Sequence, residues 1–141
     1  MTVSAVPSQT GPVTALDELL RSMSPRLNAG VYVYARVPHE AAIPASTLMM
    51  MREHEATTLI VPEHEASALG ISPMFRCEWI TLEVNSALEA VGLTAAFARA
   101  LGEANISCNV VAGADHDHIF VPAGEGDNAL AVLQALQQRS A

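Results

Sequence analysis

Residues 79–138 read WITLEVNSALEAVGLTAAFARALGEANISCNVVAGADHDHIFVPAGEGDNALAVLQALQQ, and this stretch decides the fold. It opens with side chains that alternate between polar and apolar, which is typical of a strand with one buried face. Apolar residues then recur at helical spacing from Leu93 to Ala104. The patterns predict, in order, a strand over 75–84, a helix over 93–104, strands over 106–112 and 118–121, and a helix over 127–138.

The first half of the chain is expected to contain a similar set of elements. We predict a helix over 14–23, a strand over 31–37, hairpin arms at 48–51 and 57–62, and a short helix over 63–69. By composition alone the arm at 48–51 suits either a helix or a strand. A shift of sixty residues aligns Leu59–Pro62 with Ile119–Pro122 and places 48–51 on the strand-like segment 108–111. We therefore interpret both as the first arm of a hairpin, consistent with a duplication.

The composition excludes several classes of partner. The chain has 141 residues, of which 50% are hydrophobic and 16% charged, so it can bury a full core. A formal charge of -8 repels phosphate backbones and anionic lipids, and with 4% aromatic residues no platform for stacking bases is visible. We expect no nucleic acid or membrane partner, and a cytoplasmic location because no signal peptide is recognisable. Cys77 and Cys108 lie in strand-like segments without zinc-site spacing.

The run AVGLTAAFARALGEANIS, residues 90–107, resembles the central signature of the ACT domain. In that family a glycine-leucine pair, here Gly92 and Leu93, opens the helix that follows the first strand. The resemblance implies an α+β fold, a ferredoxin-like βαββαβ sandwich with antiparallel sheets and helices on one face. The whole chain is similar to small free-standing proteins with two ACT-like lobes. We expect a flexible arm over 1–13, a degenerate N-terminal lobe over 14–73 and a C-terminal lobe over 74–141.

The sequence departs from the ACT pattern in two respects. Ala90 and Val91 stand where the family often has an acidic residue and a proline. The C-terminal lobe also lacks a fourth strand after its last helix, which leaves a sheet edge to be covered. We expect the N-terminal lobe, through residues 31–37, to lie along that edge. The connection at 38–45 is too short for a crossover helix, so we expect the helix at 14–23 to take that place.

A ligand site is expected around the glycine that opens the central helix. Gly92 lets a ligand approach backbone N–H groups, and a helix N-terminus favours a carboxylate such as that of an amino acid. The resemblance implies ligand contacts by Val91, Gly92 and Leu93, with Asn85 and Ser86 lining the same loop. The alternative is that Gly92 only makes the turn between strand and helix.

Three further polar residues are candidate ligand contacts. Asn109 lies in an apolar strand and needs a partner if it is buried, although an exposed edge would also explain it. The string Asp115-His116-Asp117-His118 contains metal-ligating types, but on a strand His116 and His118 face opposite to the aspartates. A metal site would need further ligands. We therefore expect no metal and predict that the imidazoles bind a ligand or a neighbouring lobe.

The expected function is that of a non-catalytic regulatory or sensor protein that binds a small molecule, most simply an amino acid. Neither a nucleophile elbow nor a phosphate-binding loop is present, so we expect no enzyme activity and no cofactor. A homodimer or a regulated enzyme is the expected macromolecular partner. Two alternatives stay open: a metal-dependent enzyme that uses His116 and His118, and a structural partner domain without a ligand.

Overall fold

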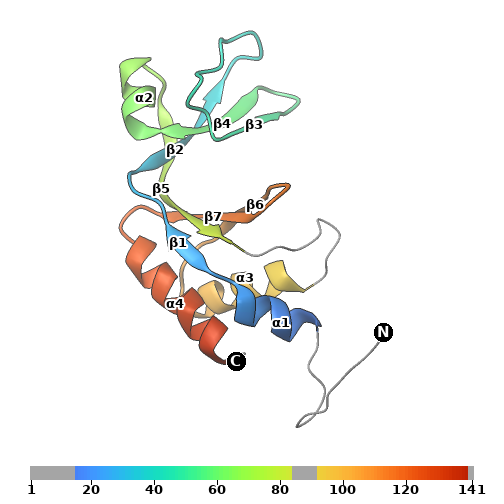
Figure 1. Ribbon diagram of the computed structural model, residues 1–141. Helices are drawn as coiled ribbons and strands as arrows, with labels where there is room; N and C mark the ends of the chain where they lie inside the picture. The colour runs from blue at the N-terminus through green and yellow to red at the C-terminus, as the bar shows by residue number, and fades with distance from the viewer. Residues whose placement is uncertain (1–14, 84–91, 140–141) are drawn as a thin grey trace.

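The computed structural model describes residues 15–83 and 92–139. Four helices and seven strands follow the predicted order, with one additional strand (Figure 1). The helices are α1 (Ala15–Ser22), α2 (Glu63–Ala68), α3 (Leu93–Glu103) and α4 (Gly126–Arg139). The strands are β1 (Pro25–Leu27), β2 (Tyr32–Val37), β3 (Met49–Arg52), β4 (Thr57–Pro62), β5 (Pro73–Leu82), β6 (Asn109–Ala112) and β7 (Asp117–Pro122). The α+β, ferredoxin-like fold class predicted from the sequence is confirmed.

All strands belong to one antiparallel sheet in the order β3-β4-β2-β5-β7-β6. The ten-residue strand β5 is its centre and pairs with β7 along one side. On the other side β2 pairs with the first half of β5 and β1 pairs with the second half. Hence β5 belongs to both halves of the sheet.

The strand that completes the sheet beside the second half of β5 differs from the one expected. Residues 31–37 do pair with β5, but only over its first half, from Pro73 to Cys77. Instead, β1 lies beside the second half, with Pro25 opposite Leu82 and Leu27 opposite Ile80. The sequence did not predict β1, because a three-residue strand that begins with proline shows no alternation. The open edge is thus covered by a segment from the N-terminal half.

The expectation that the first helix replaces a crossover in the N-terminal lobe was wrong. α1 packs instead with α3 and α4, and Leu20 and Met23 share a core with Ile80, Leu82 and Phe97. The physical reason is that α1 leads directly into β1, which is held on the second half of β5. The described connection at 38–48 contains turns and no helix.

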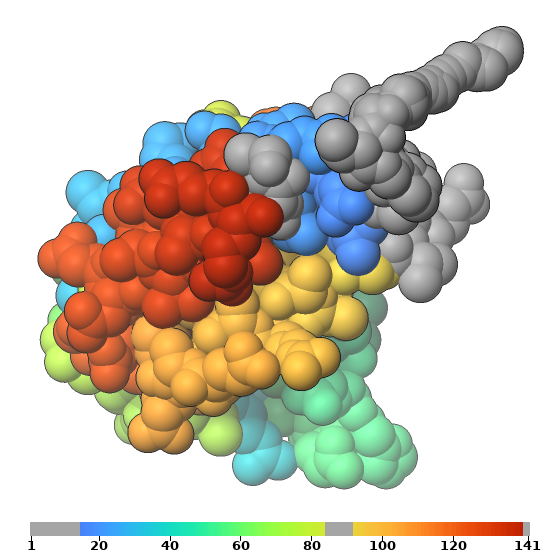
Figure 2. Space-filling model, turned by 90° about the horizontal axis from the view of Figure 1, so that it is seen from below, coloured from blue at the N-terminus to red at the C-terminus, as the bar shows by residue number. Residues whose placement is uncertain are grey.

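The helices cover the outer face of the sheet. α1, α3 and α4 lie beneath β1, β5 and β7, and together they form the underside of the molecule (Figure 2). α2 covers β2 and β4 at the other end through a smaller core. The opposite, inner face carries no helix among the described residues. The sheet folds over on this inner face, since residues of its two terminal strands, β3 and β6, line a single hollow.

Side chains of the inner face form an aromatic cluster. It contains five of the chain's six aromatic residues, together with aliphatic and sulfur-containing neighbours. The cluster consists of Tyr32, Tyr34, Phe75, Trp79 and Phe120 with Met49, Ile60, Cys77 and Val111. Composition alone indicated only that aromatic residues were scarce. The fold concentrates them because β2, β5 and β7 are adjacent and each contributes its inward-facing positions.

Candidate functional site

The sequence predicted a ligand site around Gly92, and in the structure this residue lies at the N-terminus of α3. Gly92 is the N-cap residue and has a left-handed φ of 103°, which L side chains rarely adopt. A Cβ atom at this position would lie 3.2 Å from Cδ2 of Leu16 on α1. Gly92 therefore supplies the left-handed turn at the start of α3, and the side chain that approaches it closely is Leu16. The expected ligand contact at Gly92 stays a prediction.

The first turn of α3 has backbone N–H groups that its N-cap residue does not satisfy with a side chain. The amide of Ala96 donates to the Gly92 carbonyl at 3.0 Å, which is the first bond of the helix ladder. The N–H groups that come before that of Ala96 in the first turn of α3 have no acceptor within the helix, and glycine has no side chain with which to cap them. The Leu93 side chain points into the core and is 3% exposed, so only its backbone can contact a ligand here.

Three of the predicted contacts, Asn85, Ser86 and Val91, lie outside the described residues. The others fall into two groups. Gly92 and Leu93 are at the start of α3, whereas Asn109, His116 and His118 belong to the β6–β7 hairpin.

His118 lies on the inner face and is held by hydrogen bonds. The indole Nε1 of Trp79 donates to its Nδ1 at 3.0 Å, and the Thr81 hydroxyl lies 3.3 Å from the same atom. Because an indole nitrogen can only donate, Nδ1 must be unprotonated and the neutral ring carries its proton on Nε2. Burial, followed by the nearby His116, lowers the pKa of His118. The ring is therefore a neutral acceptor within the sheet.

The same network attaches β1 to the sheet. Asn28 donates from Nδ2 to the Thr81 hydroxyl at 3.0 Å and to the Trp79 carbonyl at 3.2 Å. Arg26 in turn donates to Oδ1 of Asn28 at 2.7 Å. A hydrogen-bonded series thus runs from β1 through β5 to His118 on β7. This arrangement explains why a polar histidine and threonine occupy the inside of the fold.

His116 lies in the turn between β6 and β7. Its carbonyl accepts from the Gly113 amide at 2.9 Å, and its buried Nδ1 has no hydrogen-bond partner among residues 15–83 and 92–139. Among the described residues, no group of three His, Cys, Asp or Glu side chains could hold a metal ion. Burial raises the pKa of the neighbouring Asp117, which opposes the charged form that a metal would need. The metal-enzyme alternative gains no support from this hairpin.

Asn109 is exposed and lines an inner groove that the sequence did not reveal. We use this name for three adjoining hollows of about 540, 480 and 270 Å³. The two larger ones lie between the β3–β4 hairpin and β6, and the third lies between the β3–β4 turn, β2 and the start of β5. Glu53 and Thr58 border all three, and the Thr58 hydroxyl donates to Oε1 of Glu53 at 2.6 Å. Tyr34 borders the two larger hollows, and burial raises its pKa to about 12. The only sequence signal for this groove was the methionine run of β3.

Comparison with known proteins places the chain in a family. Models of the ACT domain match residues 11–78 and 75–135. A crystal structure from Vibrio cholerae, described as a protein of unknown function and possible transport protein, is 42% identical, with 88% of this chain and 97% of that chain covered and a TM-score of 0.77. No curated protein sequence matches.

Two more distant structures share the fold. A protein from Agrobacterium tumefaciens is 17% identical, with 82% of this chain and 89% of that chain covered and a TM-score of 0.60. The regulatory subunit of aspartate kinase from Thermus flavus is 8% identical, with coverages of 79% and 95% and a TM-score of 0.57. No helix in the described part of the chain is long and apolar enough to cross a membrane. From these matches and the fold, the chain belongs to the ACT domain family and contains two ACT-like lobes.

Proposed function

We propose that this protein is a non-catalytic regulator that binds an amino acid at the N-terminus of α3. Membership of the ACT family supports a small-molecule-binding regulatory role. The observation that carries the finer proposal is Gly92, the left-handed N-cap residue, which leaves the first helical N–H groups without a capping side chain. These groups and the helix dipole favour a carboxylate.

The surroundings of Gly92 suggest how the rest of the ligand would be held. Leu16 of α1 packs directly over the glycine and offers an apolar wall to a ligand side chain. Asn85, Ser86 and Val91 are proposed to complete the site from the preceding loop. We assign His118 to the packing of β1 against the sheet, and Asn109 to the inner groove. The proposed amino-acid site is thereby confined to one end of α3.

The regulated target is proposed to be an enzyme or a second copy of the chain. The structural neighbours include a regulatory subunit of aspartate kinase, which is a separate chain from its enzyme by its own description. The proposed lobes, 14–73 and 74–141, meet at β5, so a ligand at α3 could act on the first lobe through this strand. No reaction is assigned to the chain.

A thermal-shift screen across the twenty amino acids tests the proposal. A ligand at about 100 times its dissociation constant adds about 2.7 kcal/mol to the free energy of unfolding. The exposed Thr94 in the first turn of α3 provides a matched pair of variants. Thr94→Glu should keep or raise the free energy of unfolding, because its charge interacts favourably with the helix dipole, yet it should weaken the binding of a carboxylate. Thr94→Gln adds no charge, so it should leave the binding of a carboxylate unchanged. Flat curves for all amino acids, or equal binding by both variants, would contradict the proposal.

A further inference from the structure

We propose that the inner groove binds an extended peptide segment of a partner protein as an added β-strand. The peptide would carry apolar residues at alternate positions and a basic residue beside Glu53. This site is separate from the amino-acid site at α3 and goes beyond the proposed regulatory function. It rests on the shape of the groove, its two strand edges, its side chains and its charge.

The groove is long rather than round. Its three hollows share Glu53 and Thr58, and Met74 borders the two smaller ones. The hollow of about 540 Å³ reaches Ala112 at the end of β6, and the one of about 270 Å³ reaches Glu55 in the β3–β4 turn. Together they make a path that runs between the two hairpins in its larger part and continues beside the β3–β4 turn toward Arg36. An elongated occupant fits such a path better than a compact one.

Two unpaired strand edges border this path. β3 and β6 are the two ends of the strand order, so each pairs with only one neighbour in the described sheet. The largest hollow is lined by consecutive residues of both, 49–51 and 109–112, whereas a purely face-on contact would touch alternate residues. Outward backbone N–H and C=O groups of an edge strand are a template for another strand. Four paired residues would span about 13 Å.

The side chains of the groove suit apolar residues of varied shape. Of the six large hydrophobic residues that are exposed in the described part of the chain, three line the groove: Met50, Met51 and Met74, which are 40%, 57% and 68% exposed. Tyr34 and Phe75 form its base, with ring centroids 5.8 Å apart. Methionine side chains are flexible and polarizable, and they adapt to different apolar partners. Exposed apolar residues concentrated in one groove indicate an interaction surface.

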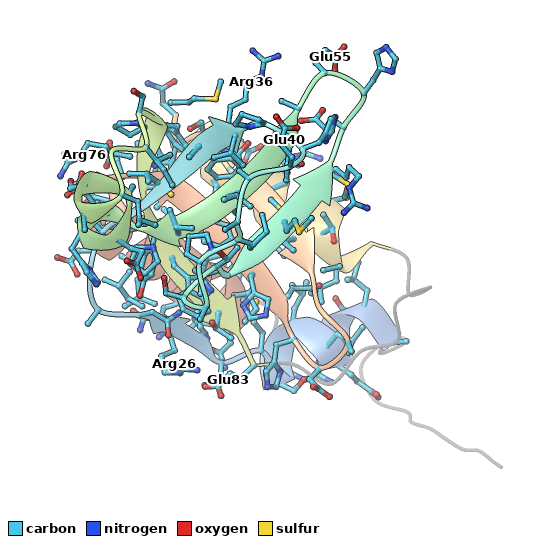
Figure 3. All side chains as sticks on the ribbon, turned by 90° about the horizontal axis from the view of Figure 1, so that it is seen from above. Arg26, Arg36, Glu40, Glu55, Arg76 and Glu83 are labelled. Atoms are coloured by element: carbon cyan, nitrogen blue, oxygen red, sulfur yellow. The ribbon has the colours of Figure 1, made fainter. Side chains whose placement is uncertain are left out.

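The charge of the groove favours a basic peptide. In the part of the chain that the structure describes, Glu53 is the only charged side chain that lines the two larger hollows, and Glu55 joins it in the third beside Arg36. Figure 3 shows Glu55 and Arg36 at the end of the molecule opposite to Arg26 and Glu83. The formal charge of the whole chain, -8, attracts cationic partners in the same sense. An acidic segment is therefore disfavoured.

The test uses fluorescein-labelled peptides and the full chain. The probe TVTVRVT alternates apolar and polar residues and carries one arginine, and its binding is measured by fluorescence anisotropy. We expect saturable binding in the micromolar range. Two further peptides carry N-methyl groups at every second residue, one at the odd and one at the even positions. The form whose methyl groups replace the paired N–H groups should not bind, whereas the other form should still bind.

Two exposed positions on the groove and one control identify the site. Met51→Glu should weaken binding at least tenfold, and Leu69→Glu, at a 55% exposed residue near α2, should not. Glu53→Arg should reverse the preference from TVTVRVT to TVTVEVT. Absence of saturable binding up to 1 mM peptide would overturn the proposal. Equal binding of both N-methylated forms would also overturn it, because the groove would then bind apolar molecules without strand pairing. A third contradicting result is a dimer of the chain that Met51→Glu dissociates and that the peptide does not affect.

Discussion

The β3–β4 and β6–β7 hairpins have the same strand lengths and the same pairing register, yet different numbers of helices pack behind them. Their strands have equal lengths at an offset of sixty residues, and Met49 faces Ile60 as Asn109 faces Phe120. Even the turns match, because the first turn residue donates to the fourth at 2.9 Å in both. Of the four described helices, however, three lie behind β6–β7 and only α2 lies behind β3–β4. The same hairpin thus serves as part of a large core in one lobe and of a small one in the other.

The repeated unit is therefore the hairpin, whereas we expect the helices to determine how stable each lobe is. The core beneath β7 includes Phe97, Leu101 and Leu133, all fully buried. The core beneath β4 is formed around Val33, Leu59 and Val61. Hydrogen exchange should consequently be faster in β3–β4 than in β6–β7, because local opening exposes less apolar surface there.

The largest expected effect comes from the core of the C-terminal lobe. Phe97→Ala removes a fully buried ring that packs among α1, α3 and β5, and should lower the free energy of unfolding by about 3–5 kcal/mol. Urea denaturation measures the loss. Leu59→Ala in the smaller core is the matched comparison and should cost about 2–5 kcal/mol. A larger loss for Leu59→Ala would refute the ranking of the two cores.

The second effect concerns how the last helices of the two lobes begin. Glu78 on β5 accepts hydrogen bonds from the amides of Gly124 and Gly126, at 2.7 and 3.0 Å, whereas the N-cap of α2 makes no side-chain bond. Glu78→Gln should lower the stability by about 1–3 kcal/mol, since it weakens two charge-assisted bonds. Glu125→Gln is the control, because its bond to exposed Asn128 is solvated. Equal losses in thermal unfolding would contradict this role for Glu78.

A third prediction concerns pH and His118, whose counterpart in the first hairpin is Thr58. The pKa of His118 is lowered from 6.5, so the folded state holds this ring neutral while the unfolded state binds a proton below that pH. The stability from His118 is present above pH 6.5 and is lost as the pH falls through the lower folded pKa. Trp79→Phe removes a donor to the neutral ring and should raise that pKa, as measured by NMR titration. An unchanged or lower pKa would mean that the indole does not fix the tautomer.

The smallest effect is expected at the surface of α3. Arg99 and Glu103 form an exposed ion pair at 3.1 Å, four residues apart. Arg99→Ala should change the stability by about 0.5 kcal/mol or less, and added salt should remove most of the difference. A loss of several kcal/mol in urea denaturation would show that the surface of α3 contributes far more than its exposure suggests.

Sequence patterns predicted the helices and strands better than they predicted which of these elements pack against one another. The β-branched run Thr57–Val61 and the apolar stripe of α3 gave strand and helix correctly, because burial of one face leaves its period in the sequence. The stripe of α1 showed that the helix is buried, but not against which lobe. Those contacts depend on β1, which is too short to show a period.

The candidate site was predictable only in part, for a related reason. Gly92 could be found because a helix start and a glycine are local features. The inner groove could not, because Tyr34, Met74 and Asn109 come from separate strands that the folding of the sheet brings together. The hydrogen bond from Trp79 to His118 likewise depends on the pairing register of β5 and β7.

The most direct test of an amino-acid site at α3 is an NMR titration of the labelled chain with each of the twenty amino acids. We predict that one of them shifts the backbone amide signals of Leu93, Thr94 and Ala95, and slows the hydrogen exchange of these amides, because its carboxylate accepts hydrogen bonds from them. Shifts that instead centre on Asn109 and His118, or no saturable shift with any amino acid, would contradict it.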